Sequence, residues 1–507
     1  MRFAKIKGKI CPEVLLHESN YSLSTNSIPS QPISSFSTIP EIPLQSTNNF
    51  NSELQKMLTG RQLLLEELPF LLQEIHEHYE KGYVSYRKGI EFKGKKIKCV
   101  RCGNETTHLF AHFPCARCRE SACFYCRHCI MMGRVSACTP LISWNGPPPR
   151  LDLPSSPFVW EGTLSEGQRT ASSRVVEAVN NNQELLVWAV CGAGKTEVLF
   201  KGIESALQQQ KRVCLATPRT DVVLELTPRL KAAFPHLPVA SLYGGSDDRH
   251  LYAPLTITTT HQLLRFYKAF DTIILDEVDA FPYSVEESLQ HAVKQARKPV
   301  SSLIYLTATP NQRWQKECRS GKRAYVTIPA RFHRHPLPVP TFTWCGNWEK
   351  KLQKSNLPSA ILKWVRSHLN EQKQALLFLP NIELMNKALT ELKALDQKIE
   401  AVHAEDPLRK EKVQRMRNKE TPILLTTTIL ERGVTFPNID VAVFGAEDDI
   451  FTESALVQIA GRVGRSREFP TGSILFFHYG KTEEMVRAKN QIIRMNNEAR
   501  KKGMIDH

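Results

Sequence analysis

The sequence has no long apolar run, and this absence excludes helices that cross a membrane. Its longest apolar stretches, such as residues 185–191, are far shorter than the roughly 18 consecutive apolar residues that such a helix needs. The basic first 11 residues are not followed by an apolar segment, which excludes a secretory signal. We therefore expect a cytoplasmic protein that does not itself span a membrane.

Acidic residues are scarce relative to basic ones. The chain has 67 lysine and arginine residues against 51 aspartate and glutamate residues, a formal net charge of +16. This excess favours a polyanionic partner, either nucleic acid or a membrane surface. An apolar fraction of 41% suffices for ordinary packed cores and excludes a wholly disordered chain. No repeat of about 20–50 residues is visible, which argues against a solenoid.

The N-terminal third falls into two parts of different composition. Residues 1–52 are rich in Ser, Asn, Pro and Thr from residue 19 onward, so we expect a disordered tail that is dispensable for enzymatic activity. Residues 53–150 begin with leucines at helical spacing, which predict two short helices broken near Gly60 and Pro69. A basic stretch and a cluster of cysteines follow, and three prolines end this part.

The rest of the chain alternates short apolar runs with helix-length segments. Runs that are apolar on both faces predict buried parallel strands, and the alternation predicts an α/β fold. The runs are residues 185–190, 212–217, 272–277, 302–309, 375–380, 422–428, 441–446 and 473–478. A proline-rich hinge over residues 329–340 separates two α/β domains, which we place at 151–335 and 336–507.

A phosphate-binding loop is expected where the sequence reads AVCGAGKT. This segment follows a predicted strand and precedes a helical one, as the GxxxxGK[ST] motif requires, although alanine replaces its first glycine. The glycines let the backbone approach the phosphates of ATP, and the amides form an anion nest. Lys195 would contact the β- and γ-phosphates, and the Thr196 hydroxyl would bind Mg²⁺. The loop comprises Ala189, Val190, Cys191, Gly192, Ala193, Gly194, Lys195 and Thr196.

Two further groups of charged residues suit ATP hydrolysis. Asp276 and Glu277 end a predicted strand 81 residues after the lysine, where the first would hold Mg²⁺ and the second would polarise the attacking water. The alternative is a helix start with solvated acids. Arg462 and Arg465 lie three residues apart on one helical face and would act as arginine fingers on the γ-phosphate. A solvated basic helix start is the alternative there.

The cysteines are concentrated in one short segment. Seven of the 13 lie within residues 99–129, which in a reducing compartment indicates metal ligands rather than disulfides. We expect one structural Zn²⁺ held by two C-x-x-C pairs, Cys99, Cys102, Cys126 and Cys129. Two alternatives stay open. Cys115 and Cys118 could replace one pair, or they could form a second site with Cys123 and Cys138, His108 or His112.

In their order along the chain, these motifs resemble those of superfamily 2 helicases and translocases. The matching segments are Gln168 in LSEGQR, AVCGAGKT, ATPRT (216–220), TTTHQ (258–262), DEVD (276–279), TAT (307–309), TTTILERG (426–433) and QIAGRVGR (458–465). The resemblance implies two tandem RecA-like domains with parallel sheets that sandwich ATP. It also implies that Gln168 reads adenine and that the TAT segment couples the two domains.

Longer phrases resemble the ComFA late-competence family over about residues 53 to 500. They are CVRCG, YCRHCIMMGRVS, WAVCGAGKTE, ATPRTDVVLEL, LYGGSDD, DEVDAFPYS, WCGNW, VHAED and TTILERGVTFP. The first two phrases carry the four expected zinc ligands, whereas Cys115, Cys118 and Cys123 depart from the family's four-cysteine pattern.

The family resemblance implies a cytoplasmic ATPase that helps draw single-stranded DNA into a transformable bacterium. It implies action at the inner face of the cell membrane behind a ComEC-like channel, with ComFC-like and DprA-like proteins as partners. Two other functions compete with this one. A replication-restart or repair helicase is disfavoured by the family phrases, and a DNA-binding scaffold with a vestigial ATPase is disfavoured by the intact lysine, acidic pair and arginines.

Overall fold

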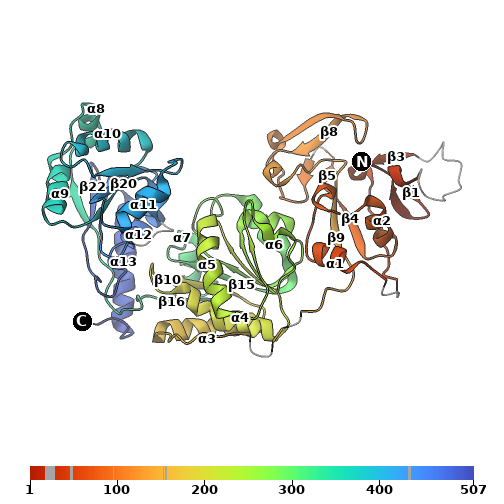
Figure 1. The fold of residues 1–507 in the computed structure, drawn as a ribbon, viewed down its shortest axis with the longest axis horizontal. Coiled ribbons are helices and arrows are strands. Elements are labelled where there is room, and N and C mark those ends of the chain that lie inside the picture. The colour runs from red at the N-terminus through yellow and green to blue at the C-terminus, as the bar shows by residue number, and fades with distance from the viewer. Residues whose placement is uncertain are drawn as a thin grey trace. The chain divides into compact units, whose positions relative to one another are not determined.

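The computed structural model describes residues 1–16, 29–45, 49–94, 96–151, 153–154, 157–431 and 436–506, with only the backbone of Glu431 (Figure 1). The last two residues of the TTTILERG segment, Arg432 and Gly433, therefore lie outside the described residues. The chain divides into two compact units. The first comprises Met1–Glu161, Val176–Glu184 and Phe200–Ile304, and the second comprises Gly162–Val175, Leu185–Leu199 and Tyr305–His507.

The first unit begins with a three-stranded antiparallel sheet that the composition did not predict. Strand β1 (Arg2–Ile6) lies between β2 (Lys9–Pro12) and β3 (Ser30–Pro32). The two-residue turn between β1 and β2 has positive φ at both residues, which suits the right-handed twist of a hairpin. Apolar side chains from this segment join the core of the helices that follow, namely Phe3, Ile10, Ile33 and Phe36.

The expected disorder of residues 1–52 is therefore wrong for the part of that segment that the structure describes. The Ser- and Asn-rich composition is an average that hides two short apolar patterns, one around Phe3 and Ile10 and one around Ile33 and Phe36. Strands β1 and β2 each bury consecutive residues, and the burial of Phe3 and Ile10 offsets the entropy of ordering them.

Replacing Phe3 with alanine is expected to destabilise the N-terminal part of the protein. Phe3 is fully buried, and its ring lies 5.7 Å from that of Tyr86, so its loss should lower the free energy of unfolding by about 3–5 kcal/mol. Val14 is 58% exposed, and Val14→Ala is the matched control, expected to change stability by less than about 0.5 kcal/mol. Thermal unfolding of the two variants measures the difference. Equal melting temperatures would restore the disordered-tail interpretation.

Residues 53–150 are called the cysteine-rich part below. The two short helices expected at its start are confirmed as α1 (Ser52–Leu58) and α2 (Leu72–Glu80). Asn51 caps α1, because its side-chain oxygen accepts hydrogen bonds from the amides of Glu53 and Leu54 at 2.8 and 3.2 Å. Three antiparallel strand pairs follow. They are β4 (Val84–Lys88) with β9 (Pro140–Trp144), β5 (Ile90–Lys93) with β6 (Lys96–Cys99), and β7 (Phe110–Cys115) with β8 (Glu120–Cys126).

The first α/β domain is built on a seven-stranded sheet with the order β12-β13-β11-β14-β15-β10-β16. Its strands are β10 (Glu184–Ala189), β11 (Val213–Thr217), β12 (Val239–Leu242), β13 (Leu255–Thr259), β14 (Phe270–Leu275), β15 (Arg297–Thr307) and β16 (Tyr325–Ile328). Its helices are α3 (Glu166–Asn180), α4 (Lys195–Gln208), α5 (Thr220–Ala233), α6 (Glu287–Ala296) and α7 (Gln312–Arg319). The pairs of β11 with β13 and β14 are parallel, and β11 is buried throughout, as its apolar run predicts.

The second α/β domain has a six-stranded parallel sheet with the order β17-β22-β21-β18-β20-β19. Its strands are β17 (Thr341–Trp344), β18 (Ala375–Phe378), β19 (Glu400–Val402), β20 (Ile423–Thr426), β21 (Asp440–Phe444) and β22 (Ile474–His478). Its helices are α8 (Trp348–Gln353), α9 (Ser359–Asn370), α10 (Ile382–Lys393), α11 (Arg409–Arg417), α12 (Glu453–Ala460) and α13 (Glu483–Lys501).

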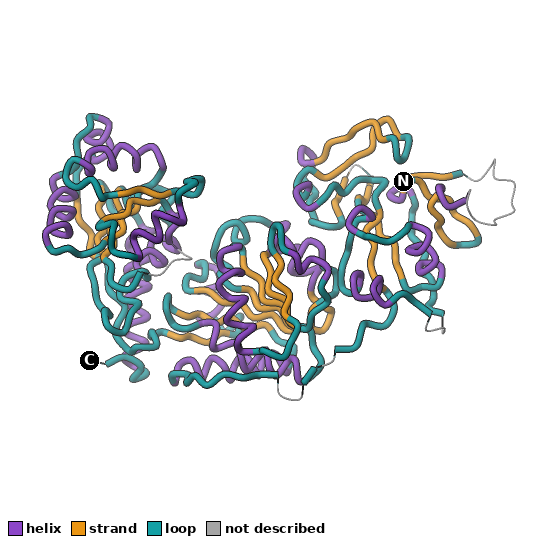
Figure 2. Tube along the Cα trace, in the orientation of Figure 1, coloured by secondary structure: helices purple, strands orange, loops and turns teal. Residues whose placement is uncertain are grey.

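Alternate residues of the second sheet enter two separate cores. Leu376 and Phe378 of β18 pack with α11, α12 and α13, whereas Ala375 and Leu377 pack with α8, α9 and α10. Figure 2 shows helices on both sides of this sheet. The sheet is thus covered by helices on both faces, and all eight predicted apolar runs form strands. The expected fold of two tandem α/β domains with parallel sheets is confirmed. Among the helices of the described residues, we find none with the length and apolarity to span a membrane.

Candidate nucleotide site and cysteine clusters

The predicted phosphate loop joins β10 to α4, and Lys195 is the first residue of that helix. Gly192 and Gly194 have φ angles of 80° and 70°, a conformation that favours glycine. The first amides of a helix are suited to binding an anion such as a phosphate. Within the described part of the chain, no hydrogen bond or ion pair engages the Lys195 ammonium, which leaves it available to a phosphate.

Gln168 lies directly against this loop. Its amide nitrogen donates to the carbonyl oxygens of Ala193 at 2.9 Å and Gly194 at 3.3 Å, and its oxygen accepts from the Ser165 amide at 2.8 Å. A side chain at Gly194 would collide with the Gln168 amide, so this close approach also requires glycine. Gln168 therefore supports the backbone of the phosphate loop, and its role in reading adenine stays a prediction.

The arginine-bearing segment after α12 also contacts the phosphate loop. The Cys191 thiol donates to the side-chain oxygen of Gln458 at 3.1 Å. Arg465 donates through Nε to the carbonyl oxygen of Gly461 at 2.8 Å, and Arg462 is only 2% exposed. The structure thus brings the segment with both predicted arginines next to the loop that carries Lys195 and Thr196.

Arg331 connects the two segments, and it was not among the predicted site residues. Its Nε donates to the carbonyl oxygen of Cys191 at 3.1 Å, and its Nη atoms donate to the carbonyl oxygens of Gly461, Val463 and Gly464. Burial, with a smaller contribution from the charge of Arg465, lowers the pKa of Arg331 to about 10. The sequence shows only one of several basic residues in a proline-rich hinge, so no local signal distinguishes it.

The TAT segment links the end of β15 to the C-terminal helices. The carbonyl oxygen of Ala308 accepts from the Trp188 indole at 3.0 Å and from the Gln491 amide at 2.7 Å. The Thr309 hydroxyl lies 2.8 Å from that of Ser454 in α12. These contacts join β10, α12 and α13 around one short segment, which is the arrangement that a coupling role requires.

The predicted acidic pair, Asp276 and Glu277, belongs to the first compact unit. The Asp276 amide donates to the carbonyl oxygen of Ala216 at 2.8 Å, which holds the end of β14 beside β11. Its carboxylate accepts from the Glu277 amide at 2.8 Å, and Glu277 has a positive φ of 54°. The roles of Asp276 and Glu277 in binding Mg²⁺ and polarising water stay predictions.

The four expected zinc ligands lie together. The thiols of Cys99, Cys102, Cys126 and Cys129 are buried, and their sulfur atoms are within 4.8 Å of one another. The Cys99–Cys129 and Cys102–Cys126 sulfur distances are 3.8 and 3.7 Å. Four sulfurs arranged tetrahedrally at about 2.3 Å from zinc would be about 3.8 Å apart. The donor set and its size therefore fit Zn²⁺.

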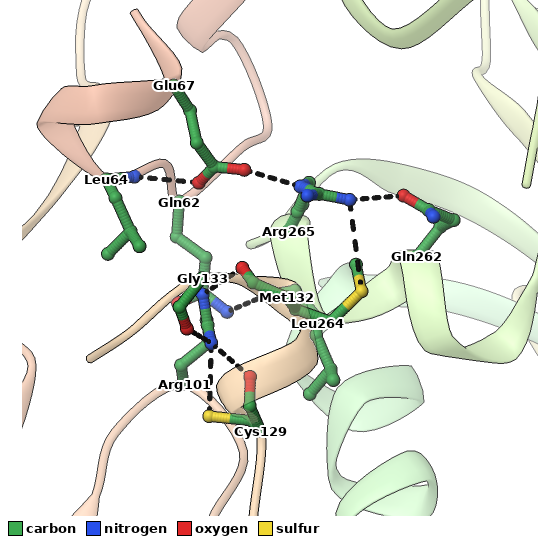
Figure 3. Close-up of polar contacts among 10 residues, drawn as sticks. All are labelled: Gln62, Leu64, Glu67, Arg101, Cys129, Met132, Gly133, Gln262, Leu264 and Arg265. Carbon is green, nitrogen blue, oxygen red and sulfur yellow. Dashed lines mark hydrogen bonds and ion pairs between the residues drawn. The ribbon is translucent and has the colours of Figure 1, made fainter. Parts of the chain in front are cut away.

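Arg101 provides positive charge beside this first cluster (Figure 3). Its fully buried guanidinium donates to the Cys129 sulfur at 3.1 Å and to the carbonyl oxygens of Cys129, Met132 and Gly133. Hydrogen bonds from Cys102 and the other cysteines, together with the charge of Arg101, hold the pKa of Cys129 well below its usual range. A deprotonated thiol is the form that binds zinc.

The cysteine-rich part also contacts the segment that contains TTTHQ (Figure 3). The Glu67 carboxylate pairs with Arg265 at 2.6 Å, and both side chains are only 13% exposed. The Gln62 amide donates to the carbonyl oxygen of Leu264 at 3.1 Å. These contacts attach the cysteine-rich part to the segment that contains TTTHQ.

A phosphate loop after a parallel strand, an arginine segment against it and two tandem sheets define a helicase-type ATPase of superfamily 2. Family models agree: the type III restriction enzyme res subunit matches residues 161–312, and the helicase conserved C-terminal domain matches residues 356–467. The competence protein ComFA N-terminal domain matches residues 46–143. The two α/β domains are therefore RecA-like helicase domains.

Two curated relatives cover most of the chain. Competence protein ComFA of Bacillus subtilis (strain 168) is 48% identical over 460 residues, which are 91% of this chain and 98% of the relative. Competence protein ComFA of Streptococcus pneumoniae (strain ATCC BAA-255 / R6) is 39% identical over 408 residues, 80% and 91% of the two chains. The chain belongs to the competence protein ComFA family, which confirms the resemblance seen in the sequence.

Among solved structures, S. cerevisiae Dbp5 bound to RNA and ADP BeF3 is similar with a TM-score of 0.47 and 15% identity. The match covers 66% of this chain and 88% of that one. At this level the similarity adds nothing to the family assignment.

Proposed function

We propose that this competence-related, helicase-like ATPase is an ATP-dependent translocase that helps draw transforming single-stranded DNA into the cytoplasm. The observation that carries the proposal is the contact between the phosphate loop and the arginine segment, made by Cys191, Gln458 and Arg331. In this arrangement, a change from ATP to its hydrolysis product at the phosphate loop acts directly on the second RecA-like domain. Family membership and the net charge of +16 support DNA as the partner.

The chemical roles follow from the residue types. Lys195 would bind the β- and γ-phosphates as a point charge, and Thr196 and Asp276 would hold Mg²⁺. When bound there, Mg²⁺ would neutralise negative charge on the phosphates during hydrolysis. Glu277 orients and polarises the attacking water, and Arg465 stabilises the transition state of phosphoryl transfer. The helicase resemblance implies that Gln168 reads the adenine.

Movement of the DNA strand follows from the same contacts. When the γ-phosphate leaves, the attraction between the phosphate loop and the arginine segment weakens. Arg331 and the carbonyl oxygen of Ala308 then transmit the change, because each binds residues from both RecA-like domains. Contacts to the strand are mostly to its phosphates, with little reading of sequence.

The cysteine-rich part would hold one structural Zn²⁺ through Cys99, Cys102, Cys126 and Cys129. The charge compensation by Arg101 supports this assignment. ComFC-like and DprA-like proteins and a ComEC-like channel at the inner face of the membrane are the partners that the family resemblance implies.

Single-stranded DNA is expected to stimulate ATP turnover with little sequence preference. The strand affinity should fall with salt, with a log–log slope of about −0.7 per phosphate contacted. Phosphate release is measured with homopolymeric and mixed oligonucleotides of equal length at several salt concentrations, and Lys195→Ala protein reports contaminating ATPase. Binding without stimulation would instead support the scaffold, and a strong preference for duplex or forked DNA would support the repair helicase.

A further inference from the structure

A second set of four thiols lies apart from the first. Cys115 ends β7, Cys118 lies in the turn that follows, Cys123 lies in β8, and Cys138 precedes β9. All four are buried, and their sulfur atoms lie within 4.8 Å of one another. The Cys115 and Cys138 sulfurs are 3.8 Å apart, the edge expected of a tetrahedron of thiolates around zinc. This set corresponds to one of the alternatives that the spacing left open.

The backbone at this second set repeats the backbone at the first. In the first set, the Gly103 amide, directly after Cys99-x-x-Cys102, donates to the carbonyl oxygen of Cys99 at 2.8 Å, and Gly103 has a φ of 74°. In the second set, the Arg119 amide, directly after Cys115-x-x-Cys118, donates to the Cys115 carbonyl at 2.7 Å, and its φ is 60°. An arginine rarely adopts this conformation, so the turn geometry rather than residue preference determines it.

The apolar core around this second set is too small to hold the hairpin alone. Beside the four cysteines, its members among the described residues are Ala137 and the half-buried Phe113. A two-stranded hairpin is at best marginally stable in water, and very small cores commonly need a metal or disulfides. The burial of four thiols in place of larger apolar side chains is therefore explained by a ligand that they share.

Basic groups lie beside the second set. Arg2 donates to the carbonyl oxygen of Cys118 at 2.8 Å. The N-terminal nitrogen of Met1 lies 3.4 Å from the carbonyl oxygen of Cys138. Arg134 lies over the Phe113 ring at 4.4 Å. Four thiolates around Zn²⁺ carry a net charge of −2, which Arg2 offsets in part, although Arg2 also pairs with Glu120 at 2.9 Å.

We propose that Cys115, Cys118, Cys123 and Cys138 bind a second structural Zn²⁺. The ion ties the β7–β8 hairpin to the segment before β9, and through Met1 and Arg2 it orders the N-terminal strand. Soft thiolate ligands in a closed, buried tetrahedral set select zinc over Mg²⁺ or Ca²⁺. Each thiol gives up its proton when it binds the metal. The site is independent of the ATPase and goes beyond the proposed function.

The test is the zinc content of the full-length protein, measured by elemental analysis and native mass spectrometry. We expect two zinc ions per wild-type chain. The Cys118→Ser variant and the Cys126→Ser variant should each retain one ion, and the double variant should retain none. Cys318→Ser is the matched control, because this buried cysteine lies in α7 outside both sets and should leave two ions. Two ions per chain would also correct the sequence-based expectation of one.

A measurement on the unaltered protein keeps the test decisive if a variant fails to fold. Cobalt substitution of the wild-type chain should give thiolate-to-cobalt charge-transfer absorption equivalent to two tetrathiolate centres. Peptide mapping under alkylation should then show all eight cysteines protected until a chelator is added. One zinc per chain with Cys115, Cys118, Cys123 and Cys138 alkylated at once, or joined in disulfides, would overturn the proposal. The ATPase assay is unaffected by that outcome, so failure here is distinct from failure of the proposed function.

Discussion

The Lys195→Ala variant is expected to lose ATP hydrolysis while keeping its fold. Lys195 begins α4 at the end of the phosphate loop, where its ammonium would stabilise the charge that develops on the phosphates. Loss of one such electrostatic group typically lowers turnover by about 10²–10³-fold or more. Since no described residue pairs with the ammonium, its removal should leave the melting temperature nearly unchanged.

Lys201→Ala is the matched control for this prediction. Lys201 lies on the exposed face of the same helix, so its loss removes an equal charge without touching the loop. Steady-state phosphate release with and without single-stranded DNA, together with thermal unfolding, measures both effects. Wild-type turnover in a folded Lys195→Ala protein would refute the phosphate-loop assignment.

The Arg465→Ala variant is expected to bind ATP but not to hydrolyse it. The half-buried Arg465 side chain is held by its bond to the Gly461 carbonyl, in the segment that contacts the phosphate loop. An arginine finger acts on the transition state rather than on bound ATP, and its loss lowers turnover by about 10³–10⁵-fold. The wholly buried Arg462 is a less clean target, because its removal would also disturb packing.

The exposed Arg467, two residues further along, supplies the control Arg467→Ala, which should hydrolyse ATP normally. Nucleotide affinity is measured by equilibrium binding and hydrolysis by single-turnover kinetics. If Arg465→Ala lost affinity while the remaining complex turned over at the wild-type rate, Arg465 would be a binding residue instead.

The sequence alone was enough to predict the features that local patterns encode. The eight apolar runs predicted eight strands, because burial on both faces of a parallel sheet demands continuous apolar side chains. The AVCGAGKT segment predicted a loop between a strand and a helix, since its glycines and lysine act within one turn of chain. Two C-x-x-C pairs predicted the first thiol cluster for the same reason.

Only the tertiary structure decided features that depend on contacts between distant segments. Phe3 and Ile10 become core residues because helices some 50 residues later supply their partners, which composition does not show. Cys138 lies beside Cys115 because the pairing of β9 with β4 determines where the segment before β9 runs. Arg331 belongs to the site because folding places carbonyl groups about 130 residues further along the chain beside it. Hydrogen bonds and thiol clusters require positions within a few ångströms, and sequence spacing does not determine such positions once the chain between them folds.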